Sequence, residues 1–276
     1  MEEDWGEIFR DIRVMEDAQK MDEKEYDIGQ ANEDYIVNLV TAENEIVNAG
    51  LNSRLPSRIM HHAWLLQVRN TAISNIVRVG GPLGVGQIIV YTAMVYVDRF
   101  LSLMPIQKGR FLVAKLLSVA CLLLANEEDR YTDDDEEELS RYEEFANCNM
   151  RSIMNMANSV LEQFEGNMTC VTPIEFTRYF LSKFCKENSR KDYVKIKTVE
   201  VIMSTLGADV KLMSLRPSIV GVAATLLTSN PNILTKEQIK SKIAARLPPK
   251  WLIPLDEVYS CYNRLLETNR QRLDIS

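Results

Sequence analysis

Two apolar segments decide the fold of this chain: QIIVYTAMVYVDRFLSL at residues 87–103 and FLVAKLLSVACLLLA at residues 111–125. The first contains only two charged residues, Asp98 and Arg99, so we expect a helix that is buried on several sides. Periodicity alone also allows a shorter strand inside each segment. The length of both segments and their many Ala, Leu and Met residues favour helices.

The rest of the chain also predicts helices and contains no convincing strand. Thr172 with Glu175 and Thr235 with Gln238 have the spacing of capping boxes, which mark helix starts. The glycines and proline of residues 80–84 are expected to end the helix before them. We therefore predict an all-α chain, with further helices near residues 35–47, 57–77, 139–146, 151–164, 173–184, 191–206, 217–228, 235–246 and 254–270.

A short internal similarity suggests a duplication. The segment VACLLL at 119–124 matches VAATLL at 222–227 in spacing and character, and each lies in the third strong helix after a capped, proline-bounded helix start. Small residues in such helices let neighbouring helices approach closely, which suits the centre of a bundle. We expect an acidic leader at 1–33, a first helical bundle at 34–170, a second at 171–270 and a tail at 271–276.

The net charge of −7 is unevenly distributed. Residues 1–34 carry 13 acids and 4 bases, and residues 127–144 carry 11 acids and 2 bases, so each segment has a charge of −9. Such runs are typically solvated, although they can also face a partner. The Lys and Arg residues elsewhere are dispersed and form no stripe with aromatic residues, which argues against nucleic-acid binding.

The pattern of the chain also argues against secretion and membrane insertion. No apolar run approaches the length of a membrane span, and the acidic start does not resemble a signal peptide. The five cysteines are scattered without paired spacing, which is typical of reduced thiols in an intracellular protein.

No catalytic or metal-ligating constellation is visible in the sequence. His61 and His62 are adjacent, so a helix would point them about 100° apart and they could not share a metal ion. The glycines at 80–86 lack the lysine of a phosphate-binding loop, and residues 133–138 lack the spacing of a calcium loop. We therefore expect a binding protein with no enzymatic activity, no cofactor and no metal.

The chain resembles the cyclin box, and is most similar to plant D-type cyclins. The resemblance rests on YVDRFL at 96–101 followed by LLSVACLLLA at 116–125, and it is supported by three shorter matches. It covers about residues 34–270. The supporting matches are Arg58 with Trp64, Val171-Thr172-Pro173 and Arg216-Pro217-Ser218.

The resemblance implies a tandem cyclin fold of two five-helix bundles. It also implies a buried ion pair between Arg58 and Asp98, which would hold the first two helices together. In this interpretation the role of Asp98 is purely structural. Leu116 corresponds to an apolar contact with a kinase, or is simply a core residue.

Two positions depart from the family pattern on the implied kinase-binding face. Where the family has a lysine, this chain has Glu127, and the family's partner glutamate corresponds to Asn149. The family's Leu-x-Cys-x-Glu signature for retinoblastoma binding is absent. The leader instead has Trp5, Ile8, Phe9 and Ile12 at helical spacing, which could fold on a partner or stay disordered.

A substrate-docking groove is also implied by the resemblance, on the first helix of the first bundle. It would include Met60, His61, Trp64 and Gln67, of which Trp64 keeps the family pattern best.

The resemblance thus implies a D-type-cyclin-like regulatory subunit that binds and activates a cyclin-dependent serine/threonine kinase in G1/S control. Kinase inhibitors and substrates are further expected partners, nucleic acid and membranes are not, and nucleus and cytoplasm are the expected locations. The alternative is a cyclin-fold scaffold that binds proteins without stimulating a kinase, because of Glu127 and Asn149.

Overall fold

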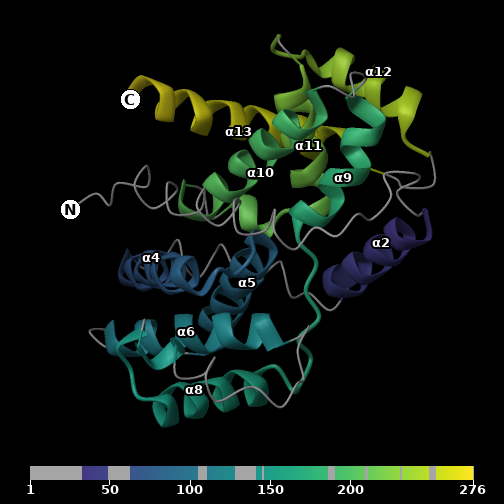
Figure 1. The fold of residues 1–276 in the computed structure, drawn as a ribbon. Coiled ribbons are helices and arrows are strands. Elements are labelled where there is room, and N and C mark those ends of the chain that lie inside the picture. Colours follow the sequence, from purple (N-terminus) through teal and green to yellow (C-terminus); the bar gives the residue numbers. More distant parts are fainter. Residues whose placement is uncertain are drawn as a thin grey trace. The chain divides into compact units, whose positions relative to one another are not determined.

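The described part of the chain is mostly helical. The computed structural model describes residues 33–48, 63–104, 111–127, 141–144, 146–185, 190–208, 211–230, 232–248 and 253–275, and within these ranges there is no strand. The all-α prediction is confirmed, including the helices at 87–103 and 111–127. The helices are α2 (Glu33–Asn48), α4 (Ala63–Leu83), α5 (Gln87–Leu103), α6 (Phe111–Glu127), α8 (Met150–Gln163), α9 (Pro173–Phe184), α10 (Lys191–Ala208), the 3₁₀ helix η2 (Leu212–Ser214), α11 (Pro217–Ser229), α12 (Lys236–Arg246) and α13 (Leu255–Ile275) (Figure 1).

The chain divides into two compact units, with one boundary between residues 170 and 171. Unit 1 contains α4, α5, α6 and α8, and unit 2 contains α2 and α9 to α13. The first predicted bundle began at residue 34, whereas helix α2, which spans residues 33–48, groups with unit 2. The predicted tail at 271–276 continues α13 as far as Ile275. The predicted leader lies, except for Glu33, outside the described residues.

Helix α6 is the central helix of unit 1. It packs against α4, α5 and α8, and Figure 1 shows it between α8 on one side and α4 and α5 on the other. All six residues of the VACLLL segment at 119–124 are buried. Ser118, which is fully buried, accepts a hydrogen bond of 2.7 Å from the side-chain amide of Asn75 on α4. A small polar residue on α6 therefore pairs with the neighbouring helix where the two helices meet.

Helix α11 has the same central place in unit 2, where it packs against α9, α10 and α13. A Cβ added at Gly221 would lie 3.0 Å from the carbonyl oxygen of Pro173 and 3.2 Å from the Cβ of Phe176, both on α9. The glycine thus permits the close approach of the two helices. The segments that matched in the sequence, at 119–124 and 222–227, lie in the two central helices.

Helix α4 continues through the glycines and proline that were expected to stop it. That prediction was wrong, because the helix includes Pro82 and ends only after Leu83. The chain turns at Gly84, which has a φ of 70°. The amide of Gly84 donates to the carbonyl of Gly81, and the amide of Val85 donates to the carbonyl of Gly80. This is the hydrogen-bond pattern of a Schellman motif, which needs a glycine only at the residue with positive φ.

Capping contacts begin two helices of unit 2 where the sequence predicted them. The amide of Thr172 donates a hydrogen bond of 2.5 Å to the carboxylate of Glu175. At α12, Thr235 and Gln238 exchange hydrogen bonds of 2.9 and 3.3 Å. Helix α9 presents an aromatic face to the core, because Phe176, Tyr179, Phe180 and Phe184 are all buried.

Helix α5 holds the segment that leaves unit 1 after α8. The hydroxyl of Tyr96 donates to the carbonyl of Met168, and the guanidinium of Arg99 donates to the carbonyl of Asn167, each at 2.7 Å. The Arg99 guanidinium also lies 4.0 Å from the centre of the Phe164 ring. The YVDRFL segment that marks the sequence resemblance therefore fixes the last residues of unit 1.

Candidate functional site

The implied partner-binding face lies on α6 and α8, which pack against each other within unit 1. Leu116 on α6 is half-buried, so it contributes to the packing and also reaches the surface. Asn149 is exposed and lies at the N-cap of α8. Glu127 is the last residue of α6, and its side chain lies outside the described residues. The face is therefore built from two adjacent helices of one unit.

The N-terminus of α8 has a carboxylate that the sequence analysis missed. The Asn149 side chain makes no capping hydrogen bond, and its carbonyl accepts the amides of Ser152 and Ile153 at 2.9 and 3.1 Å. The carboxylate of Glu143 accepts the amide of Met150 instead. An acidic residue shortly before a helix start favours such a contact, because the first amides of a helix lack partners within it. The position of Glu143 before α8 was the feature of the sequence that could have indicated this contact.

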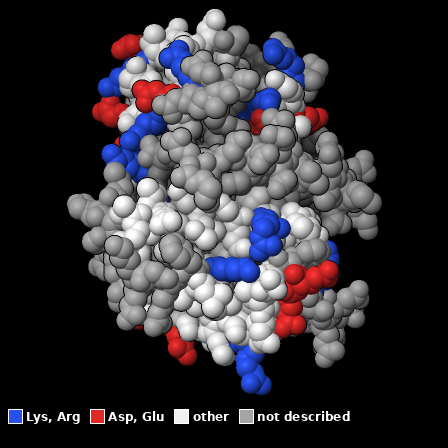
Figure 2. Space-filling model, turned by 90° about the vertical axis from the view of Figure 1, so that its left-hand side faces the viewer, with Lys and Arg blue, Asp and Glu red and all other residues white. Residues whose placement is uncertain are grey.

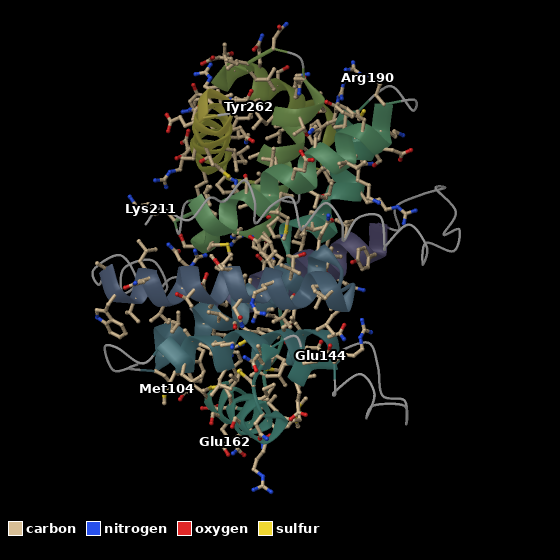
Figure 3. All side chains as sticks on the ribbon, turned by 60° about the vertical axis from the view of Figure 1, so that its left-hand side comes forward. Met104, Glu144, Glu162, Arg190, Lys211 and Tyr262 are labelled. Carbon is tan, nitrogen blue, oxygen red and sulfur yellow. The ribbon has the colours of Figure 1, made fainter. Side chains whose placement is uncertain are left out.

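The exposed face of α8 has an uncharged centre. Its buried residues are Ile153, Ala157 and Val160, and its exposed residues follow the same helical spacing on the opposite side. Charges occur only at the two ends of that exposed side, and Figure 3 labels Glu162 at the C-terminal end. The exposed residues are Arg151, Met154, Asn155, Asn158, Ser159 and Glu162. Charged residues are depleted at the centres of protein interfaces, so this pattern suits a binding surface.

The buried ion pair of unit 1 joins Asp98 to Arg69, a partner that the sequence analysis did not name. The Arg69 guanidinium donates to both carboxylate oxygens of Asp98, at 2.8 and 3.0 Å, and the two side chains are 1% exposed or less. Burial raises the pKa of Asp98, and the charge of Arg69 opposes that shift. The predicted partner Arg58 lies outside the described residues. No local signal separated Arg69 from the other basic residues of the sequence.

Two of the four residues predicted for the docking groove can be located, both in the first turns of α4. Trp64 is half-buried and Gln67 is exposed, and Leu66 beside them is 39% exposed. Met60 and His61 lie outside the described residues. The start of α4 therefore presents an apolar and uncharged surface, which is the character expected of a peptide-binding groove.

The described residues contain no group of His, Cys, Asp and Glu side chains that could hold a metal ion. Burial raises the pKa of the Cys121 thiol, an environment typical of an unreactive cysteine. On the face shown in Figure 2, the Lys and Arg residues that are described stand in separate groups and form no continuous stripe. None of the helices in the described part of the chain combines the length and apolar character that a membrane span requires.

Comparison with known proteins agrees with this arrangement of helices. Residues 42–169 match the family described as "Cyclin, N-terminal domain". The matched range begins inside α2 and covers all of α4, α5, α6 and α8. Residues 42–169, which include the four helices of unit 1, thus match the cyclin N-terminal domain, and the described helices fit the all-α cyclin fold.

Within the cyclins, the chain is similar to plant D-type proteins. It is 29% identical to Cyclin-D5-2 of Oryza sativa over 74% of this chain and 58% of that protein. It is 28% identical to Cyclin-D5-1 of Arabidopsis thaliana over 87% of this chain and 73% of that protein. The human G1/S-specific cyclin-D1 is 28% identical over 49% of this chain and 44% of its own length. The match thus spans little more than half of the Oryza relative and less than half of the human protein.

Proposed function

We propose that this protein is a D-type-cyclin-like regulatory subunit that binds and activates a cyclin-dependent serine/threonine kinase in G1/S control. The observation that carries the proposal is the match of residues 42–169 to the cyclin N-terminal domain, which covers α6 and the three helices packed around it. The similarity to proteins named as D-type and G1/S-specific cyclins supports the cell-cycle part of the proposal.

In this mechanism the chain performs no reaction itself. The α6–α8 face docks against a mobile helix of the kinase and favours the conformation in which the kinase's catalytic ion pair is assembled. Leu116 and Met154 supply apolar contact, and the uncharged side chains of Asn155 and Asn158 supply hydrogen bonds. Kinase inhibitors and substrates are further partners in the proposal, nucleic acid and membranes are not, and the protein acts in the nucleus and cytoplasm.

A specific observation favours a second candidate function. The positions of the kinase-gripping pair hold Glu127 and Asn149, so the charge at the first position is opposite to that of the family pattern. A chain with this change could bind a kinase or another protein and leave kinase activity unstimulated. This second candidate is a non-activating scaffold of cyclin fold.

The two candidates are separated by one experiment on the purified full chain. A panel of cyclin-dependent kinases is tested first for binding in pull-downs and then for phosphorylation of a histone substrate. Binding with stimulated activity supports the proposed function, and binding without stimulation supports the scaffold. If the chain binds none of the kinases, neither the activating subunit nor a scaffold that binds a kinase is supported, and both are overturned.

Two variants show whether the α6–α8 face makes the contact. Leu116→Arg places a charge on the half-buried part of α6 and is expected to abolish capture of the kinase. Ser241→Arg places the same charge on the exposed face of α12 in unit 2 and is the matched control. Equal capture by both variants would show that the kinase binds elsewhere on the chain.

A further inference from the structure

The carboxylate of Glu43 on α2 is buried in unit 2. The residue is 2% exposed, a rare state for a glutamate. Both of its oxygens accept hydrogen bonds from Ser218 at the start of α11: the backbone amide donates at 2.7 Å and the hydroxyl donates at 2.8 Å. These two residues are 175 positions apart in the sequence.

This carboxylate substitutes for a local cap on α11. The N-cap residue of α11, Arg216, makes no side-chain capping hydrogen bond, and the next residue is Pro217. The first amides of a helix lack partners within it, and the positive end of the helix dipole attracts an anion. The carboxylate of Glu43 accepts a backbone amide of α11 and places a negative charge at the positive end of that helix. The positive charge of Arg216 favours the ionised form of Glu43. The start of the central helix of unit 2 thus depends on a residue supplied by α2.

The rest of the contact made by α2 is narrow. Among the α2 side chains that are described, only Ile36, Leu39 and Glu43 are buried. Their spacing places them along one side of the helix. Tyr35 and Val37 are 50% and 41% exposed. The apolar residues Val40, Ala42, Ile46 and Val47 are half-buried. A helix whose fully buried contacts are two apolar residues and one doubly bonded carboxylate should depend strongly on that carboxylate.

We propose that α2 is a releasable strap of unit 2 and that Glu43 is the residue that anchors it. When the Glu43–Ser218 contact breaks, α2 detaches while α9, α10, α11 and α13 keep their packing. Detachment uncovers Ile36, Leu39 and the N-terminus of α11.

Amide hydrogen exchange of the full chain, followed by mass spectrometry, tests this proposal region by region. In Glu43→Ala we expect exchange across residues 36–48 to accelerate about tenfold or more, since two hydrogen bonds to a charged acceptor are lost. Exchange in α5 and α6 should stay within about twofold of the wild type, because release is local. Glu43→Gln, which keeps an acceptor for the amide of Ser218, should retain most of the protection.

Two further variants keep the result interpretable. Glu45→Ala removes an exposed carboxylate from the same helix and should leave exchange of α2 unchanged. Ser218→Ala removes only the hydroxyl donor and should give an intermediate acceleration, even if Glu43→Ala folds poorly. Unchanged exchange of α2 in both Glu43→Ala and Ser218→Ala would overturn the proposal. So would acceleration of equal size in both units, because that pattern means global unfolding.

Discussion

Arg69 and Asp98 form a doubly hydrogen-bonded ion pair between α4 and α5, in which both side chains are withdrawn from solvent. Asp98 belongs to the YVDRFL segment on which the sequence resemblance rests, and its neighbour Arg99 binds the segment that leaves unit 1. One short segment of α5 therefore holds both α4 and the segment that follows α8.

Removal of one partner of this pair should be far more harmful than removal of both. We expect Arg69→Met to destabilise the chain by about 3–5 kcal/mol, because the buried Asp98 charge loses its partner. The double variant Arg69→Met/Asp98→Leu should recover most of that loss. Urea unfolding followed by near-ultraviolet circular dichroism measures both, with Arg151→Met on the exposed side of α8 as the control. If the single and double variants were equally unstable, the pair would be contributing through packing alone.

The close approach at Gly221 predicts a marked effect of one methyl group. In Gly221→Ala the new Cβ would lie 3.0 Å from the carbonyl oxygen of Pro173, so α9 and α11 must separate. We expect a loss of about 1–3 kcal/mol, although alanine is the better helix former. Thermal unfolding measures the loss, and Ser241→Ala on the exposed face of α12 serves as the control. An increase in melting temperature would show that the two helices have room for the methyl group.

The altered pair on the α6–α8 face predicts a gain of function. Because the sequence resemblance aligns Glu127 and Asn149 with the family's lysine and glutamate, Glu127→Lys/Asn149→Glu should strengthen kinase binding by about tenfold. Binding is measured by titration with the kinase captured most strongly from the panel. Glu237→Lys with Ser241→Glu makes similar charge changes on the exposed face of α12 in unit 2 and is the control. No change in affinity or in stimulated activity would show that the pair is not used.

The uncharged centre of the exposed α8 face predicts sensitivity to a new charge. Asn158→Lys introduces an ammonium group that the interface would have to desolvate, so kinase affinity should fall by about tenfold or more. The unfolding temperature should not change, because Asn158 is exposed. Asn158→Ser, which stays uncharged, is the matched control. Full affinity in Asn158→Lys would place this face outside the interface.

The buried carboxylate of Glu43 predicts a particular dependence on pH. Burial raises the pKa of Glu43 above its usual value of 4.5, while the hydrogen bonds from Ser218 and the charge of Arg216 oppose the shift. A carboxyl group with a raised pKa binds its proton more tightly in the folded state, so this stabilisation is present below pH 4.5 and is lost as the pH rises through the folded pKa. The margin by which the melting temperature of the wild type exceeds that of Glu43→Gln should therefore shrink as the pH rises and then level off.

Melting curves recorded between about pH 4 and pH 8 measure that margin. Glu45→Gln, at an exposed position of the same helix, should show no margin that varies with pH. A constant difference between Glu43→Gln and the wild type would mean that Glu43 has the same pKa in the folded and unfolded states.

The elements that were predictable from the sequence depend on local patterns. The apolar content of residues 87–103 and 111–125 predicted buried helices, and the capping contacts at Glu175 and Gln238 formed where their spacing indicated. The end of α4 was not predictable from composition, because only Gly84 needs a positive φ and the glycines before it remain helical.

Contacts between distant residues could not be read from the sequence. Nothing near Arg69 distinguished it as the partner of Asp98, because an ion pair between helices depends on how those helices pack. For the same reason, Glu43 was indistinguishable from the exposed Glu45 two residues later. The charge change at Glu127 was visible only through the family resemblance, since periodicity assigns no role to a residue at the end of a helix.

The position of α2 has a practical consequence for how this chain is cut into fragments. A fragment made to the limits of the matched family range would start inside α2 and would carry Glu43 away from the helix that it caps. The complementary fragment, starting at residue 171, would lack Glu43, so the Ser218 amide would be exposed to water. The apolar surface that Ile36 and Leu39 cover would be exposed as well. We therefore expect a C-terminal fragment to be more soluble when residues 33–48 are added in trans as a peptide. The affinity of the fragment for that peptide would measure how much α2 contributes to the stability of unit 2.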